Sequence, residues 1–258
     1  MIEPEELIDE VIVENQGTFW STSALKTIEA CGKQYWFRYI ERAKTKPTVY
    51  LAFGRTVHKV IELVHTNNDF SDKYWQRQWD EEWSKNSSRV DWTGFKKGTF
   101  TNMGIKILGK YVDENQQVKV LHSELKFPPK SEDYMIGEFK VRGVIDQIRL
   151  EKGRPMVVDF KTSGKEPDPL IFRADPQWTL YWDYARKFLG EEPLLGLYHL
   201  KTGKLIPTER TQADVDLVLE SLKDAQKKVD QEMFSRSIGF QCNFCDFKDI
   251  CLGNIGKV

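Results

Sequence analysis

The first part of the chain has the hydrophobic periodicity of helices. Apolar residues recur every three to four positions, and Ser21 and Ser23 are suitable N-cap residues for the first helix. The pattern predicts three helical regions, which span Ser21 or Ser23 to about Arg42, Leu51 to about His65, and residues 70–115. Trp75, Trp79 and Trp83 recur at helical spacing in the third region. Such a stripe is typical of a buried face, and a platform for stacking nucleic-acid bases is the alternative.

After residue 117 the pattern changes to the alternation that is typical of β-strands. The predicted strands are Val118–Phe127, Val141–Leu150, Met156–Lys161 and Leu194–Lys201. The second and third strands are expected to form a hairpin through a turn at Glu151–Pro155, and an amphipathic helix is expected from Thr211 to about Met233. This order predicts a single mixed α/β domain over residues 1–258, with a helical region at 1–117, a sheet-containing core at 118–237 and a cysteine-bearing segment at 238–258.

Composition and charge limit the classes of protein without choosing among them. Apolar residues make up 40% of the chain, which is ample for a buried core. The formal net charge is only −1, so any surface that binds nucleic acid would be local. Candidates for such a surface, which are equally consistent with ordinary solvated surface, are the segment Gly94–Gly98 and the residues Lys33, Arg38, Arg42, Lys44 and Lys46.

The beginning of the chain and its apolar runs bear on its location. No apolar run approaches the roughly 18 residues of a membrane span. The first fifteen residues are rich in acidic side chains, unlike a secretory or mitochondrial leader. We therefore expect a cytoplasmic protein that does not interact with a membrane.

The third predicted strand ends in an acidic residue and a lysine two positions apart. Side chains alternate between the faces of a strand, so Asp159 and Lys161 project from the same face, and Asp146 of the neighbouring strand lies close to them. Paired carboxylates are suitable ligands for Mg²⁺ or Mn²⁺, and a lysine can neutralise developing charge or orient a water molecule. A solvated ion pair at a strand end is the alternative that these residues alone leave open.

Two further pairs of polar residues have helical spacing. Asp175 followed by proline is a good helix start, and it places Gln177 and Tyr181 one turn apart on the same face. His58 and Glu62 are also four residues apart on a predicted helix. Taken alone, His58 is more often a structural or surface histidine than a metal ligand.

The four cysteines of the chain are Cys31 and a C-x2-C-x5-C segment formed by Cys242, Cys245 and Cys251. In a cytoplasmic protein, thiols with these spacings favour a bound metal over disulfide bonds. Tetrahedral sulfur ligation suits zinc or an iron–sulfur cluster, and the spacing leaves both open. Either would join the first helix to the C-terminal segment and stabilise the fold.

The order and spacing of these motifs resemble the PD-(D/E)XK nuclease superfamily, and within it the RecB-type nucleases. The matching segments are G-x-x-D at Gly143–Asp146, D-F-K-T at Asp159–Thr162, Q-x-x-x-Y at Gln177–Tyr181 and G-x-x-x-H-x-x-x-E at Gly54–Glu62. The resemblance implies a restriction-endonuclease-like mixed β-sheet flanked by helices. One cysteine before this core and three after it is the arrangement of iron–sulfur nucleases such as AddB and the CRISPR-associated RecB-like exonucleases. It therefore implies a [4Fe–4S] cluster, with structural zinc as the alternative.

The resemblance also implies a role for each matching residue. The implied catalytic residues are Asp146, Asp159, Lys161, Gln177 and Tyr181. The implied ligands of Mg²⁺ or Mn²⁺ are His58, Asp146 and Asp159, and the implied cluster ligands are Cys31, Cys242, Cys245 and Cys251. Glu62 and Glu124 are expected to have supporting roles.

The function implied by the resemblance is a metal-dependent deoxyribonuclease. We expect an exonuclease that acts on single-stranded DNA or strand ends in recombination, repair or phage replication, in a bacterium or a phage-infected cell. An endonuclease within a larger complex, such as CRISPR spacer processing, and a catalytically silent iron–sulfur module that binds DNA ends are the alternatives. The sequence has no G-x-x-x-x-G-K-[ST] segment, so any unwinding of DNA would require a helicase or recombination partner.

Overall fold

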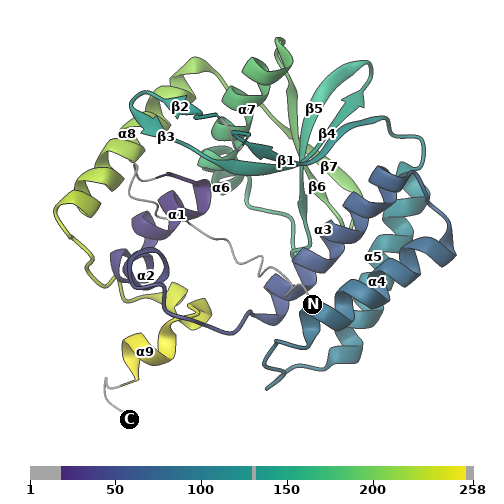
Figure 1. Ribbon diagram of the computed structural model, residues 1–258, viewed down its shortest axis with the longest axis horizontal. Coiled ribbons are helices and arrows are strands. Elements are labelled where there is room, and N and C mark those ends of the chain that lie inside the picture. Colours follow the sequence, from purple (N-terminus) through teal and green to yellow (C-terminus); the bar gives the residue numbers. More distant parts are fainter. Residues whose placement is uncertain (1–18, 130–131, 254–258) are drawn as a thin grey trace.

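A five-stranded sheet lies at the centre of the computed structural model, which describes residues 19–129 and 132–253 (Figure 1). The sheet has the order β1-β4-β5-β6-β7. Its strands are β1 (Val120–Phe127), β4 (Gly143–Glu151), β5 (Arg154–Lys161), β6 (Leu194–His199) and β7 (Lys204–Thr208). Strands β5 and β6 are parallel, and the other neighbouring pairs are antiparallel. The predicted mixed α/β class is confirmed.

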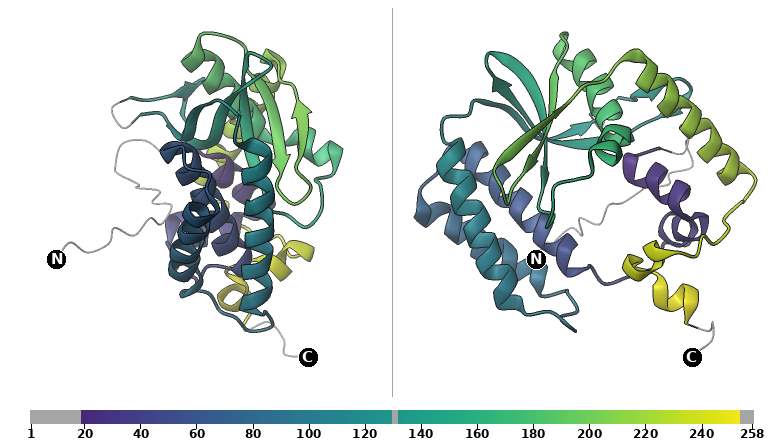
Figure 2. Two further views of the ribbon diagram at one scale, coloured as in Figure 1. Left: turned by 90° about the vertical axis from the view of Figure 1, so that its right-hand side faces the viewer. Right: turned by 180° about the vertical axis from the view of Figure 1, so that it is seen from behind.

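Three long helices cover one face of the sheet: α3 (Val49–Asn67), α4 (Asp72–Ser87) and α5 (Lys97–Asn115) (Figures 1 and 2). Their apolar side chains form one core with β5. The tryptophans of α4 belong to this core, since Trp75, Trp79 and Trp83 are only 3%, 0% and 4% exposed. The alternative of a base-stacking platform at these tryptophans is therefore wrong.

The opposite face of the sheet is covered by α1 (Thr22–Ala30), α7 (Pro176–Leu189), α8 (Gln212–Asp230) and the small hairpin of β2 (Met135–Ile136) and β3 (Phe139–Lys140). A second core fills this side. Val157 of β5 belongs to it, whereas the adjacent Val158 belongs to the core under α3 to α5. Strand β5 is thus buried on both faces, which explains its continuous apolar run in the sequence.

The predicted first helix, from Ser21 to about Arg42, is interrupted, and this is a correction. Helix α1 ends at Ala30, Cys31 has an extended backbone (φ −163°, ψ 110°), and α2 (Gly32–Tyr35) and a π-helical turn (Trp36–Ile40) follow. Gly32 lies at the break, where a Cβ atom would be 3.0 Å from the Cα of Phe234. Apolar residues continue through the break, so the hydrophobic pattern did not reveal it. The cysteine therefore lies between two helices.

The turn between β4 and β5 is shorter than predicted, because Arg154 and Pro155 belong to β5. Lys152 and Gly153 form the connection, and both have positive φ (51° and 81°), as in the tight turns that match strand twist. The sequence also did not predict α6 (Pro169–Ala174), β2, β3, β7, or the C-terminal 3-10 turn (Phe240–Phe244) and α9 (Lys248–Leu252). Strand β7 was missed because it contains Pro207, which an edge strand tolerates.

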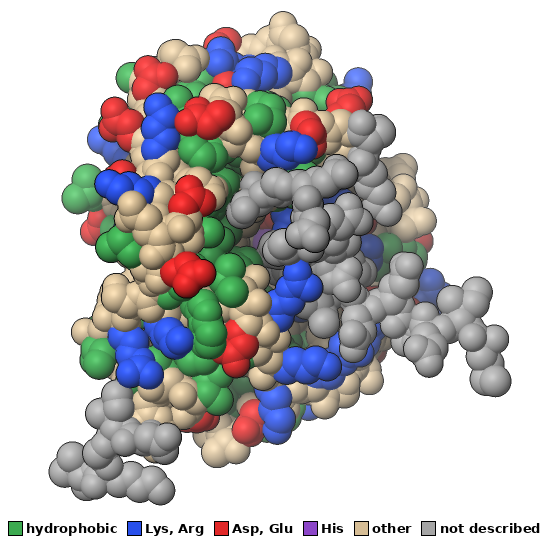
Figure 3. Space-filling view, turned by 60° about the vertical axis from the view of Figure 1, so that its left-hand side comes forward, with side chains coloured by type: hydrophobic (Ala, Val, Ile, Leu, Met, Phe, Trp, Pro, Cys, Tyr) green, Lys and Arg blue, Asp and Glu red, His purple; other side chains and the backbone are tan. Residues whose placement is uncertain are grey.

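Charged side chains of both signs are mixed over the upper part of the face shown in Figure 3. This distribution agrees with a formal net charge near zero. Among the described residues, no helix is both long and apolar enough to cross a membrane.

Helix α5 passes very close to Trp79 at Gly104. A Cβ atom at Gly104 would lie 2.0 Å from Cη2 of the Trp79 ring, whose side chain is fully buried. We expect Gly104→Ala to lower the free energy of unfolding by about 2 kcal/mol, because overpacking outweighs the gain in helix propensity. Urea denaturation monitored by circular dichroism measures this change.

Gly109 of the same helix supplies a matched control. A Cβ atom at Gly109 would make only ordinary contact, 3.6 Å from Cζ2 of Trp75. Gly109→Ala should therefore leave stability unchanged or increase it by up to about 1 kcal/mol. Equal effects of the two substitutions would contradict the close packing of α5 against Trp79.

Candidate functional site

The candidate site lies where β4 and β5 separate. Backbone pairing between these strands extends to Gln147 and Val158 and then stops. Beyond that point the carboxylate of Asp146 lies between the strands, where Oδ2 accepts a hydrogen bond of 2.7 Å from the backbone N–H of Phe160. A side chain thus satisfies a donor that the neighbouring strand leaves free. The same separation places Asp159 beside Asp146.

Three residues from three elements meet at this point: His58 of α3, Glu124 of β1 and Asp146 of β4. Each has a ligand atom, and these atoms all lie within 4.8 Å of one another. Nδ1 of His58 is 3.4 Å from Oδ1 of Asp146. One imidazole and two carboxylates are a suitable set for Mn²⁺ or Mg²⁺. The sequence-based ligand set named Asp159 in place of Glu124.

Glu124 has an unusual backbone for a strand residue, with φ of 48°. A non-glycine residue in this region is strained, and such strain is often concentrated at functional sites. Burial, together with the nearby Asp146 carboxylate, raises the pKa of Glu124 to about 7. A cation bound among these carboxylates would relieve their repulsion, and the structure places Glu124 directly beside His58 and Asp146.

The electrostatics of His58 and Asp146 show a strongly coupled pair. Burial disfavours the charged imidazolium, but Asp146, Asp159 and Glu124 outweigh this effect and raise the pKa of His58 to about 9. Burial likewise opposes ionisation of Asp146, yet His58 holds its pKa below the usual value. Ligation of a cation needs the neutral imidazole, so cation binding would release a proton from His58.

Asp159 is 2% exposed, and its two carboxylate oxygens have different partners. Oδ1 accepts a hydrogen bond of 2.6 Å from Gln177. Oδ2 forms an ion pair of 2.8 Å with Nζ of Lys161. Burial lowers the pKa of Lys161, but Asp159 and Asp146 outweigh this effect and raise it. Lys161 is therefore a cation at neutral pH.

Gln177 and Tyr181 connect the two separating strands. The Asp175 carboxylate caps helix α7 by accepting a hydrogen bond of 3.0 Å from the backbone N–H of Gln177. The amide of Gln177 donates to Oδ1 of Asp159 and, at 2.7 Å, to the hydroxyl of Tyr181. That hydroxyl donates at 2.6 Å to the carbonyl of Val144, two residues before Asp146. The pair thus fixes β4 relative to β5 at the site.

Glu62 does not belong to the group of three ligand atoms. Its carboxylate forms an ion pair of 2.7 Å with Lys59, one turn earlier on α3. The negative charge of Glu62 nevertheless contributes to the raised pKa of Glu124.

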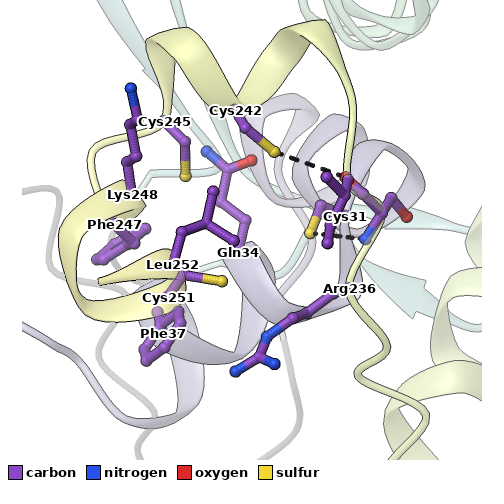
Figure 4. Close-up of a pocket in the computed structure, with 12 residues that line it drawn as sticks. Cys31, Gln34, Phe37, Arg236, Cys242, Cys245, Phe247, Lys248, Cys251 and Leu252 are labelled. Carbon is purple, nitrogen blue, oxygen red and sulfur yellow. Dashed lines mark hydrogen bonds between the residues drawn. The ribbon is translucent and has the colours of Figure 1, made fainter. Parts of the chain in front are cut away.

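The four cysteines line one pocket, although more than 200 residues separate Cys31 from the other three (Figure 4). All four thiols are free. The backbone N–H of Ser237 donates to Sγ of Cys31 at 3.5 Å. The C-terminal segment is also held by an ion pair of 2.6 Å between Arg38 and Asp246 and by stacking of Phe37 on Phe247. The break after α1 directs Cys31 into this pocket.

Comparisons with known proteins agree with this geometry. A family model described as the PD-(D/E)XK nuclease superfamily matches residues 19–252. The crystal structure of a candidate exonuclease from Eubacterium rectale is similar in fold, with a TM-score of 0.54 and 13% identity, and the match covers 93% of this chain and 89% of that one. A second solved structure, SSO0001, is 14% identical over 91% of this chain and 96% of that one, with a TM-score of only 0.32. No curated protein matches the chain.

Proposed function

The chain belongs to the PD-(D/E)XK nuclease superfamily, and from this premise we propose that it is a metal-dependent DNA exonuclease acting on single strands or strand ends. The observation that carries the proposal is the meeting of His58, Glu124 and Asp146 beside the Asp159–Lys161 pair. These residues come from four different elements, and ionisable groups gathered at one point with strongly shifted pKa values are typical of functional sites. The similar fold of the candidate exonuclease from Eubacterium rectale is in line with this proposal.

The residues fit a divalent cation. His58, Glu124 and Asp146 would hold it, and Asp159 supplies a further buried carboxylate, whose Oδ2 atom pairs with Lys161. When bound, Mg²⁺ or Mn²⁺ polarises a phosphoryl oxygen and lowers the pKa of a coordinated water. The donor set is rich in carboxylate oxygen, which is typical of sites for these ions.

The protein side chains then have separate tasks at the phosphodiester. The ammonium group of Lys161, held protonated by Asp159, neutralises charge that develops on the phosphoryl oxygens in the transition state. Gln177 holds Asp159 in one orientation, and Tyr181 holds the Val144 end of β4. Positioning and charge stabilisation supply most of the rate increase in phosphoryl transfer.

The test of this function is digestion of three labelled DNA substrates: linear single-stranded, linear double-stranded and circular single-stranded DNA. Each substrate is incubated with the parent protein and Mg²⁺ or Mn²⁺, and a parallel incubation with the Lys161→Ala variant is the control. We expect metal-dependent loss of linear strands only, abolished in the variant, and separate labels at the two ends give the polarity. Cleavage of the circle would instead indicate an endonuclease. Binding without any cleavage would indicate a module that only holds DNA ends.

The cysteine pocket is proposed to hold a [4Fe–4S] cluster with a structural role. Four thiols that line one pocket supply the four sulfur ligands that either a [4Fe–4S] cluster or zinc requires. The backbone N–H of Ser237 donates a hydrogen bond to Sγ of Cys31, and hydrogen bonds of this kind stabilise a cluster thiolate.

The cluster proposal predicts a coloured protein. Anaerobically purified protein should be brown and contain iron and acid-labile sulfide. Metal analysis and visible absorbance provide the measurement. Colourless protein with stoichiometric zinc would contradict the cluster and favour a structural zinc site.

Gln177→Ala is expected to lower kcat by about 100-fold with little change in KM. The substitution removes the amide that orients Asp159, and loss of a group that orients a metal-binding residue typically has an effect of this size. Steady-state kinetics on labelled single strands measures the change. Gln212→Ala is the matched control, because Gln212 is exposed at the start of α8 and its side chain is hydrogen-bonded to Arg186 and Asp216, away from Asp159. Equal kinetics of the two variants would contradict a positioning role for Gln177.

A further inference from the structure

Two segments that are distant in sequence meet at the N-terminal end of α3. Residues 41–50 lead from the π-helical turn into α3, and residues 88–97 connect α4 to α5 at the same end of the three-helix layer (Figure 1). The rings of Tyr50 and Phe95 are in contact, with centroids 5.8 Å apart and planes at 88°. The sequence showed basic residues in each segment, but only the structure brings the two together.

Tyr50 and Phe95 form an exposed aromatic pair on a buried base. The two side chains are 64% and 41% exposed. Both rest on the buried ring of Phe100, with centroid distances of 5.8 Å and 6.1 Å. Their orientation is therefore fixed by packing, while their outer surfaces remain open to solvent. Fixed and accessible rings are suitable platforms for stacking bases, and such stacking tolerates any sequence.

The charge of the two segments differs from that of the whole chain. Together they contain two carboxylates, Glu41 and Asp91, and six cations. The cations are Arg42, Lys44, Lys46, Arg89, Lys96 and Lys97. All eight side chains are exposed. A local excess of positive charge on a chain with net charge −1 indicates a polyanionic partner.

Three lysines of these segments have no carboxylate partner in the part of the chain that the structure describes. Lys44, Lys96 and Lys97 form no ion pair within the described residues. Asp91, near Lys46, already accepts hydrogen bonds from the backbone N–H and hydroxyl of Thr93. By contrast, other basic residues of the region are engaged elsewhere: Lys33 lies 3.3 Å from the Trp36 ring centre, and Arg38 pairs with Asp246.

The position of the surface relative to the candidate site supports a nucleic-acid strand as partner. Tyr50 precedes His58 by eight residues on α3, which corresponds to about 12 Å along the helix axis. A strand held at Tyr50 thus needs only a few nucleotides to reach the metal site.

We propose that residues 41–50 and 88–97 form a strand-binding surface for single-stranded nucleic acid. Tyr50 and Phe95 stack on bases, and Lys44, Lys46, Lys96 and Lys97 contact phosphates. The proposal deepens the proposed nuclease function by naming where its substrate strand is held. Binding itself does not require cleavage, so it can be measured separately.

The experiment is fluorescence anisotropy with a labelled oligothymidylate, performed with Mg²⁺ in the Lys161→Ala variant so that the strand is not cut. Combining Lys96→Ala with Lys97→Ala should reduce the slope of log affinity against log salt by about 1.4, as for the loss of two phosphate contacts to a single strand. Tyr50→Ala should weaken binding by roughly 10-fold, and Tyr50→Phe should restore it, because the ring stacks on a base. These positions are exposed, so folding should be preserved, and thermal unfolding verifies this.

Two exposed lysines on the other side of the molecule supply the matched control. Lys223→Ala combined with Lys227→Ala on α8 removes the same charge far from the strand-binding surface, and it should leave the salt slope unchanged (Figures 1 and 2). Equal slopes for the two double variants, or unchanged affinity of Tyr50→Ala, would overturn the proposal. If these substitutions weakened binding of a blunt duplex more than binding of the single strand, the assignment to single strands would be overturned. The binding measurements do not require cleavage. Failure of the nuclease proposal in the digestion test is therefore distinguishable from failure of the strand-binding proposal.

Discussion

Asp146→Asn is expected to reduce metal-dependent DNA cleavage on the order of a thousandfold. Asparagine retains an oxygen that can accept the hydrogen bond from the backbone N–H of Phe160, so the separation of β4 and β5 should be preserved. The negative charge that faces His58 and Glu124 is lost, and with it one of the proposed carboxylate ligands. Initial rates on labelled linear strands over a range of Mg²⁺ concentrations measure the effect.

A measurement of metal binding, which does not depend on turnover, shows whether Asp146→Asn loses activity because it no longer binds the cation. Calorimetric titration with Mn²⁺ should show binding to the parent protein and binding at least 10-fold weaker to Asp146→Asn, since loss of a single charged ligand has a large effect on a site with few ligands. Asp224→Asn, an exposed aspartate on α8, is the control and should match the parent in both measurements. A rate for Asp146→Asn close to that of the parent would contradict the placement of Asp146 at the centre of the site.

Cys31→Ala is expected to give the largest loss of stability among single substitutions in the cysteine pocket. Cys31 lies in one pocket with cysteines more than 200 residues later, and the proposed metal group would act there as a cross-link that closes a very long loop. We expect the free energy of unfolding to fall on the order of 4 kcal/mol, as for a covalent link that closes a long loop. Urea denaturation and iron content, measured on the same preparation, provide the test.

The neighbouring Ser237→Ala distinguishes loss of the thiol from a local disturbance. The backbone N–H of Ser237, which donates to Sγ of Cys31, is retained in this variant. Ser237→Ala should therefore keep both its iron and the stability of the parent. If Cys31→Ala unfolded at the same urea concentration as the parent and kept its iron, the four thiols would not share one metal group.

Elements defined by local signals could be predicted from the sequence. The N-cap Asp175, followed by proline, predicts the start of α7, and the structure shows the expected capping hydrogen bond. The β-branched run of β5 with turn residues before it predicts the hairpin with β4. Gln177 and Tyr181 share a helix face because of their spacing alone, and their hydrogen bond follows from that spacing.

Features that depend on distant contacts could not be predicted. The break at Cys31 is set by close packing of Gly32 against Phe234, which lies about 200 residues later. The grouping of Glu124 with His58 and Asp146 depends on a positive φ at Glu124 and on the position of α3 against the sheet. Strand alternation gives no information about either. The partner strand β7 was hidden because Pro207 reads as a strand breaker until its place at the edge of the sheet is known.

The distribution of the four cysteines along the chain has a consequence for synthesis. The pocket requires a residue near the beginning of the described fold and three residues near its end. At 5–20 residues per second, the delay between them on the ribosome is on the order of 10 to 40 s. During this interval the thiol of Cys31 has none of its partners and is open to oxidation. The yield of protein with an intact cysteine pocket should therefore depend on how reducing the cell is while the chain is being made, and not only on the supply of metal afterwards.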